Sequence, residues 1–226
     1  MTTKKITLPI RYWDQKPTRR ICPTDENGRT LEVSYYFWAR FTGLSTTYPL
    51  NLLYSYRDQH LYLPMREKFM SLNRGTVYES TDMSYDMEEK TCGKMCSVPV
   101  FYFVYNMANY YHFVYDTLPY LYGYFNEKKV HPDMKLLVSP PDGKDDLYPF
   151  VWESLELLGI KRKDVIFLDT DTVYDRVCIG SSLTHNGLSN CPPHQGVFDI
   201  LNSMKSDYIG PEKIYISRRT WVNSDV

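Results

Sequence analysis

The sequence of 226 residues lacks the features of a membrane-spanning, an exported or a nucleic-acid-binding chain. No stretch approaches about 18 uninterrupted apolar residues, which excludes a transmembrane helix. The first residues, MTTKKITLPIRYW, carry charge but no apolar core, so they do not form a secretory signal peptide. The formal net charge of -1 gives no basic excess, which nucleic acids and anionic membrane surfaces both demand. We therefore expect a cytoplasmic protein of a bacterium or virus, with no nucleic acid among its partners and no membrane span.

Cysteine is sparse, with five residues at scattered positions. This odd number, in a chain without an export signal, indicates reduced thiols. Cys92 and Cys96 could begin a metal site, but no second pair follows at the spacing of zinc ligands. A Cys-His hydrolase that uses Cys191 or Cys178 with His194 has no supporting sequence context. We expect no metal at these cysteines.

Two kinds of pattern divide the chain. Residues 1–96 indicate short strands and turns, since β-branched and aromatic residues fill segments such as TLEVSYYFWARF and turn formers separate some of them. From residue 97, strand patterns alternate with helix patterns: SVPVFYFV, a helix over about 107–128, KLLVS, a helix in LYPFVWESLELLG, DVIFLD, TVYDRVCIG, a helix near GVFDILNSMK, and KIYIS. This alternation predicts an α/β fold with a Rossmann-like parallel sheet.

We accordingly expect three parts. A strand-rich part over residues 1–96 packs on the core, and a Rossmann-like domain covers residues 97–210. Residues 211–226 begin a further domain with the strand KIYIS.

The densest aromatic stretch of the chain, NMANYYHFVYDTLPYLYGY at residues 106–124, carries one histidine and one aspartate. His112 and Asp116 are four residues apart, which places them on one face of an α-helix, so the carboxylate can orient the imidazole. Histidine is largely neutral at pH 7, so His112 could remove a proton from a substrate hydroxyl while the aromatic rings support a sugar. The alternative is a surface ion pair on a helix whose tyrosines belong to the core. Pro119 predicts a kink or a helix end directly after the pair.

Asp169 and Asp171 form a D-x-D motif directly after the apolar strand pattern VIFL. Two carboxylates at this spacing can hold Mg²⁺ or Mn²⁺ against a nucleotide diphosphate, as in many sugar transferases. The alternative is an ordinary turn, in which acidic residues are common. The metal site is therefore the second hypothesis.

Arg218 and Arg219 follow the strand pattern KIYIS. Ligands of open parallel sheets bind beyond the carboxyl ends of the strands, which makes this position and the loop after VIFL candidate ligand sites. Two guanidinium groups can hold a diphosphate as bidentate donors in place of a metal. A solvated strand end is the alternative.

Several of these segments together resemble glycosyltransferase family 61, the group of EGF-domain O-linked N-acetylglucosamine transferases and plant xylan xylosyltransferases. NYYHFVYDTLPYLY, residues 109–122, is similar to the family's N-x-x-H-x-x-x-D-x-x-P block. KLLVSP, FVWESLELLGI, DVIFLD, YDRVCIG and EKIYISRR then follow in the family's order. The resemblance covers about residues 97–221, whereas the first hundred residues match only in general character.

The resemblance implies the N-terminal half of a GT-B fold. It implies an inverting and metal-independent transfer of a sugar from a nucleotide-sugar donor to a hydroxyl of a glycan or protein acceptor, without a cofactor. It also assigns Asp169 and Asp171 to a variable turn. The site residues that it implies are His112 and Asp116 for catalysis, Asn109, Tyr111 and Tyr115 on the acceptor side, and Arg218 and Arg219 for donor binding.

In the family the YISR strand opens a long donor-binding domain, whereas this sequence ends with TWVNSDV. We therefore expect most of the donor half to lie outside this sequence, and transfer activity in glycan biosynthesis to need it. A non-catalytic module that binds carbohydrate or protein through the tyrosine-rich surface is the alternative from another class. A metal-dependent D-x-D transferase is the other alternative.

Overall fold

The computed structural model describes residues 5–12, 20–21, 35–36, 38–47, 52–55, 60–63, 84–89, 92–104, 107–141, 143–180, 183 and 195–205. Its strands are β1 (Lys5–Tyr12), β2 (Arg20–Ile21), β3 (Tyr35–Tyr36), β4 (Trp38–Thr47), β5 (Leu52–Ser55), β6 (His60–Leu63), β7 (Ser84–Glu88), β8 (Lys94–Cys96), β9 (Val100–Tyr102), β10 (Lys135–Val138), β11 (Val165–Phe167) and β12 (Thr172–Gly180). Its helical segments are α2 (Tyr110–His112), η1 (Phe113–Thr117), η2 (Leu118–Tyr120), α3 (Leu121–Lys128), α4 (Pro149–Leu157), η3 (Arg162–Asp164) and α5 (Gln195–Ser203).

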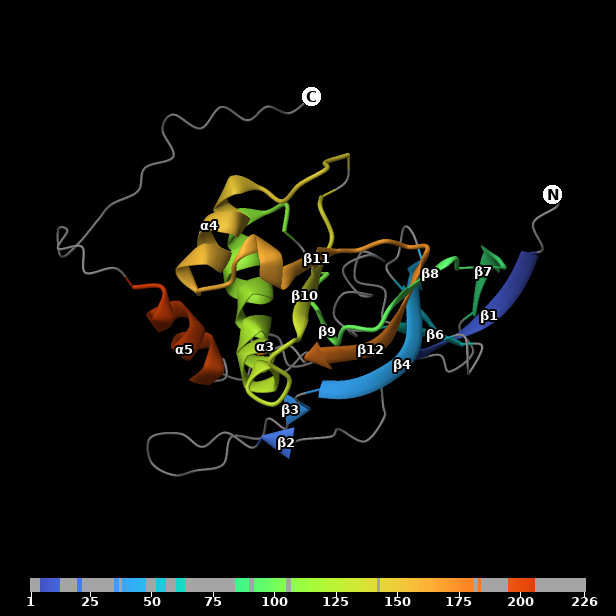
Figure 1. Ribbon diagram of the computed structural model, residues 1–226, viewed down its shortest axis with the longest axis horizontal. Helices are drawn as coiled ribbons and strands as arrows, with labels where there is room; N and C mark the ends of the chain where they lie inside the picture. The colour runs from blue at the N-terminus through green and yellow to red at the C-terminus, as the bar shows by residue number, and fades with distance from the viewer. Residues whose placement is uncertain are drawn as a thin grey trace.

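Five strands form the parallel part of the sheet, so the chain has an α/β fold, as the alternation of patterns predicts. β10 pairs in parallel with β9 and β11, and β12 pairs in parallel with β8 and β9. The central strands are buried along their length, which explains why VFY and LLV are continuous apolar runs rather than alternating ones. Figure 1 shows α3, α4 and α5 together on one side of these strands, with α3 between α5 and the sheet.

The side chains of the parallel strands divide between two apolar clusters according to the two-residue period of a strand. Phe101 and Leu136 belong to the cluster that also contains the helices, whereas Val100 and Leu137 belong to a second cluster on the opposite face. The helical side is rich in aromatic residues, and its fully buried members include Phe113. The larger of the two clusters therefore lies between the parallel strands and the helices.

The sheet is mixed, and in this respect the prediction of a parallel sheet is incomplete. β12 pairs antiparallel with β4 from Trp38 opposite Gly180 to Leu44 opposite Tyr174, and β5, β6, β1 and β7 continue the same sheet. Through β4, the strands β5, β6, β1 and β7 thus belong to the same hydrogen-bonded sheet as the parallel part, whereas β2 and β3 form a separate two-stranded sheet. Figure 1 shows β1, β6 and β7 at the end of the sheet away from the helices.

Helix α4 ends as its sequence predicts, at a glycine. Gly159 adopts φ +78°, a conformation that glycine enters without a steric penalty. Its amide donates to the carbonyl of Glu156, and the amide of Ile160 donates to the carbonyl of Leu155. This pair of bonds is a Schellman motif, which satisfies the last carbonyls of the helix and directs the chain toward β11.

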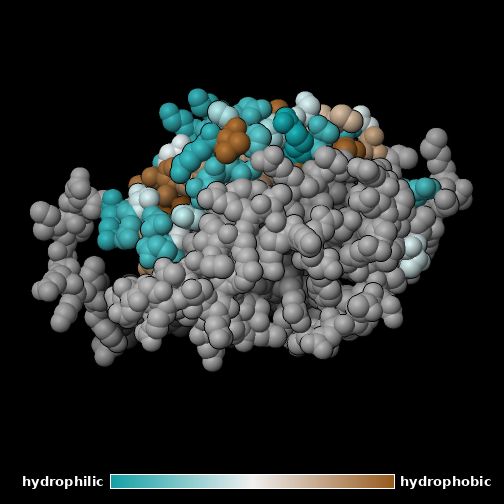
Figure 2. Space-filling view, turned by 90° about the horizontal axis from the view of Figure 1, so that it is seen from below, coloured by the Kyte–Doolittle hydropathy of each residue, from teal (hydrophilic) through white to brown (hydrophobic). Residues whose placement is uncertain are grey.

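None of the described helices has the length and apolar content needed to cross a membrane. On the face shown in Figure 2, hydrophobic residues are scattered among hydrophilic ones wherever the described part of the chain is visible.

Gly196 allows α5 to approach α3 closely, and we expect Gly196→Ala to lower the free energy of unfolding. A Cβ atom at Gly196 would lie 2.7 Å from Cγ of Tyr122, so the ring or the helix must shift. Overpacking of this kind costs about 1 to 3 kcal/mol, partly offset by the helix propensity of alanine. Urea denaturation measures the loss. Gly93→Ala is the matched control, because a Cβ there meets no atom within 4 Å. Equal stability of both variants would contradict the prediction.

Candidate functional site

The segment that carries the proposed site changes helical type along its length. Asn109 caps α2, since its side-chain Oδ1 accepts a hydrogen bond from the amide of His112 at 3.2 Å. A π-turn follows over Phe113–Thr117, in which the amide of Leu118 donates to the carbonyl of Phe113. The segment then tightens to the 3₁₀ turn η2 around Pro119 and continues as α3 to Lys128. The predicted helix over 107–128 is therefore helical from residue 110. The kink expected at Pro119 consists of the π-turn η1 followed by the 3₁₀ turn η2.

His112 and Asp116 are in direct contact. Nδ1 of His112 lies 2.6 Å from Oδ2 of Asp116, with side chains that are 48% and 27% exposed. An ionised carboxylate can only accept a hydrogen bond, so the proton of this contact belongs to Nδ1. In the neutral imidazole, this arrangement leaves the lone pair on Nε2. The i, i+4 contact expected from the sequence is thus formed.

The tyrosines around this pair are not all core residues. Tyr110 and Tyr111 are each 64% exposed. The ring of Tyr111 stacks on Tyr115 at 5.8 Å with an interplanar angle of 19°, and meets the edge of the His112 ring at 5.4 Å. A flat aromatic surface therefore adjoins the imidazole. The buried tyrosines of the segment lie further along it, at positions 120 and 124.

The site begins at the carboxyl side of the central strand. β9 ends at Tyr102, and α2 is the first helix after it. Beyond the carboxyl ends of parallel strands is where open α/β sheets bind ligands. From the sequence, this rule indicated the loop after VIFL and the end of KIYIS, but not the end of β9. The sequence feature that could have indicated this site was the apolar run VPVFYFV, a strand pattern directly before the aromatic segment.

Asp169 is part of a turn whose polar groups are bonded to one another. Its carboxylate accepts hydrogen bonds from Nζ of Lys94 at 2.8 Å, from the amide of Asp171 at 2.9 Å and from Oγ1 of Thr172 at 3.0 Å. These contacts tie β8 to the turn between β11 and β12. Among the described residues no group of three His, Cys, Asp or Glu side chains could hold a metal ion. A metal at Asp169 would have to displace the Lys94 ammonium.

We expect the Asp169 turn to contribute stability that depends on pH. The hydrogen bond from Lys94, followed by the amide of Asp171, lowers the pKa of Asp169 to about 2. Because the folded pKa lies below the ordinary value of about 4, the contribution is complete above about pH 4 and is lost as the pH falls toward 2. The side chain is 38% exposed, so solvent screening limits the effect to about 1 kcal/mol or less.

Urea unfolding over this pH range tests the prediction with two variants. Asp169→Asn should flatten the decline in stability between about pH 4 and pH 2. Asp175→Asn removes one exposed carboxylate of β12 and serves as the control. A decline of unchanged steepness in Asp169→Asn would show that the turn does not contribute.

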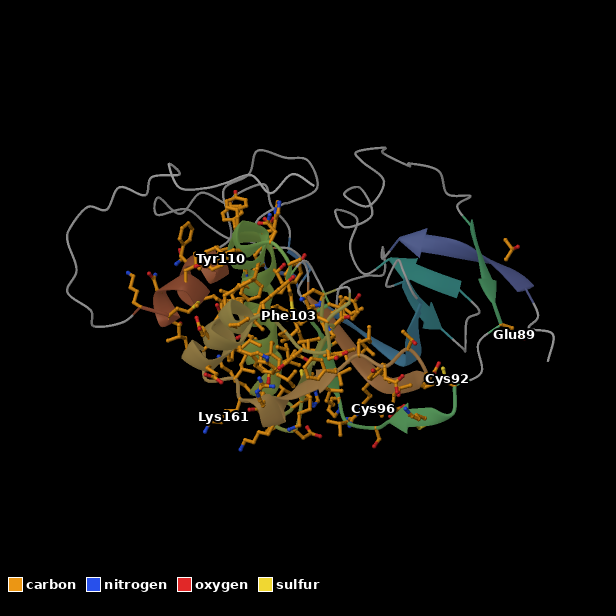
Figure 3. All side chains as sticks on the ribbon, turned by 90° about the horizontal axis from the view of Figure 1, so that it is seen from above. Glu89, Cys92, Cys96, Phe103, Tyr110 and Lys161 are labelled. Atoms are coloured by element: carbon orange, nitrogen blue, oxygen red, sulfur yellow. The ribbon has the colours of Figure 1, made fainter. Side chains whose placement is uncertain are left out.

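Two of the candidate cysteines lie away from the site. Cys92, Cys96 and Cys178 form no disulfide, and Figure 3 shows Cys92 and Cys96 at the far side of the described structure from Tyr110. The thiol of Cys92 lies 3.9 Å from the carbonyl oxygen of Thr170, a contact within the Asp169 turn region. Arg218, Arg219, Cys191 and His194 lie outside the described residues.

An aromatic contact that the sequence argument missed supports the site from α4. Phe150 meets the edges of Tyr110 at 5.3 Å and of Phe113 at 5.5 Å. The helix pattern LYPFVWESLELLG contains Phe150 but does not indicate which residues its ring contacts.

The resemblance to glycosyltransferase family 61 stays a prediction, because comparison with protein-family models, curated proteins and solved structures found no match for this chain.

Proposed function

We propose that this chain is the acceptor-side part of an inverting glycosyltransferase with the GT-B architecture. The observation that carries the proposal is the 2.6 Å contact between Nδ1 of His112 and Oδ2 of Asp116, on the first helix after the central strand. This contact gives the chain an oriented and solvent-accessible base. The resemblance of the surrounding segment to family 61 indicates that such a base would act in the transfer of a sugar to an acceptor hydroxyl.

The strand order supports the architecture. β11, β10, β9 and β12 are adjacent in that order, which is 3-2-1-4 in chain order. A doubly wound nucleotide-binding sheet begins with this order. One feature differs from such a sheet, because residues 168–171 join β11 to β12 without a helix. The GT-B proposal therefore rests on the order of the strands and on the resemblance.

The reaction follows from the tautomer of His112. Nε2 accepts the proton of the acceptor hydroxyl, and the oxygen attacks the anomeric carbon of the nucleotide sugar. The bond between this carbon and the diphosphate oxygen breaks, and the diphosphate leaves with the electron pair, so the configuration inverts. Arg218 or Arg219 would stabilise the departing charge, which is why the proposal needs no metal.

The aromatic surface supports an acceptor that carries a sugar or a peptide chain. Tyr111 offers an exposed ring beside His112, and Tyr115 holds that ring by stacking. Rings of this kind supply contact area with little loss of side-chain entropy on binding. Asn109 contributes through the helix cap that fixes the amide of His112.

A second candidate function is a non-catalytic carbohydrate-binding module. The exposure of both Tyr110 and Tyr111 favours it, because a binding surface of this kind needs aromatic rings but no base. A D-x-D metal transferase is the weaker alternative, since Asp169 already accepts three hydrogen bonds.

Screening of sugar-nucleotide transfer, with and without EDTA, tests the proposal. The screen uses the longest natural chain that contains this sequence, with glycan and peptide acceptors. Transfer that persists in EDTA supports the proposal, and transfer that EDTA abolishes supports the D-x-D alternative. Acceptor binding without transfer or donor hydrolysis supports the binding module.

A further inference from the structure

We propose that Phe150 is a positioning residue that holds His112 in the tautomer and orientation set by Asp116. Phe150 lies in the first turn of α4, far from His112 in the sequence. Its ring meets two residues of the site segment, Tyr110 at 5.3 Å and Phe113 at 5.5 Å, both edge to face. These residues flank Tyr111 and His112, so a single ring of α4 spans the turn that carries the base.

The side chain of His112 is 48% exposed, and among the described residues it contacts the carboxylate of Asp116 and the ring of Tyr111. Its orientation therefore also depends on the backbone of the turn. The contacts that hold this backbone include the cap from Asn109 and the ring of Phe113, which is fully buried and packs on Phe150.

Phe113 also begins the π-turn that contains Asp116. The amide of Phe113 donates to the carbonyl of Asn109 at 2.8 Å, and its own carbonyl accepts from Leu118. A shift of Phe113 therefore moves both ends of the contact between His112 and Asp116. Tyr148 also stacks on Phe150, with ring centroids 5.6 Å apart and an interplanar angle of 10°, which limits the movement of the Phe150 ring.

The ring ¹⁵N shifts of His112 in the 226-residue chain report the tautomer directly. We expect the Nδ1–H form in the unaltered protein and a mixture with the Nε2–H form in Asp116→Asn. Phe150→Ala and the milder Phe150→Leu should show the same mixture while circular dichroism stays unchanged. Phe125→Leu is the matched control, since Phe125 is also half-buried, packs on the same cluster and contacts Tyr124 instead. It should keep the Nδ1–H form.

The expected effect of Phe150 variants on the rate of sugar transfer rests on the proposed function. In a chain that catalyses transfer, Phe150→Leu should lower kcat by about 10- to 100-fold with little change in KM for the donor. If Phe150→Ala does not fold, Phe150→Leu provides the same comparison. A folded Phe150 variant that keeps the Nδ1–H form of His112 overturns the inference. Loss of the Nδ1–H form in Phe125→Leu also overturns it. Absence of transfer with the tautomer pattern as expected removes the proposed function and leaves the positioning role of Phe150 intact.

Discussion

Replacing His112 by Ala should remove about 2 to 5 kcal/mol of transition-state stabilisation from sugar transfer, in the longest chain that is active. The expected cause is loss of the Nε2 lone pair that accepts the acceptor proton. Binding of the nucleotide sugar should change little, because the donor contacts belong to other residues in the proposal. Measurement of kcat and of KM for donor and acceptor separates these effects. Turnover that stays unchanged in this variant would remove His112 from the mechanism.

Two further variants test whether the loss of activity is specific to the pair of His112 and Asp116. Asp116→Asn should also slow transfer, because an amide can donate as well as accept and no longer fixes the tautomer. His131→Ala removes another histidine, which follows the far end of α3, and should leave transfer unchanged. A loss in His131→Ala equal to that in His112→Ala would indicate a general effect on folding.

Replacing Phe101 by Ala should lower the free energy of unfolding by about 3 to 5 kcal/mol. Phe101 lies in the middle of β9, is fully buried and meets the edge of the Tyr124 ring at 5.9 Å. Its ring also lies under Gly123 of α3, where an added Cβ would approach to 3.1 Å. Truncation therefore removes apolar contacts and leaves a cavity between β9 and α3.

Urea denaturation with an exposed phenylalanine as control tests this expectation. Phe198, on α5, is 47% exposed, so Phe198→Ala should cost much less. If Phe101→Ala does not fold, Phe101→Leu should still show the larger loss. Equal losses at both positions would mean that β9 is not at the centre of the core.

Local sequence signals predicted the local structure well. The glycine after α4 predicted its end, because glycine tolerates the left-handed conformation that a Schellman motif needs. The spacing of His112 and Asp116 predicted their contact, since it depends only on helical geometry. Pro119 predicted a disturbance of the helix, but not its form, because several turn types accommodate a missing donor.

Contacts between distant segments were not predictable in this way. The antiparallel pairing of β4 with β12 depends on backbone hydrogen bonds that carry no side-chain pattern. The partner of Asp169 is Lys94, 75 residues away, so the D-x-D motif alone could not distinguish a metal site from a bonded turn. Helical spacing could not separate the exposed Tyr111 from the buried Tyr120, because both lie in one aromatic run.

The π-turn over Phe113–Thr117 has a consequence for the evolution of the chain. In this turn the amide of residue i+5, instead of residue i+4, donates to the carbonyl of residue i. The turn therefore accommodates one extra residue within an otherwise continuous helical segment. Deletion of one residue between His112 and Asp116 would remove the extra residue of this turn, although Pro119 would still lack an amide donor. It would also place His112 and Asp116 three residues apart and rotate the capped turn relative to α3. Homologues that retain the paired base should therefore keep the length of this turn.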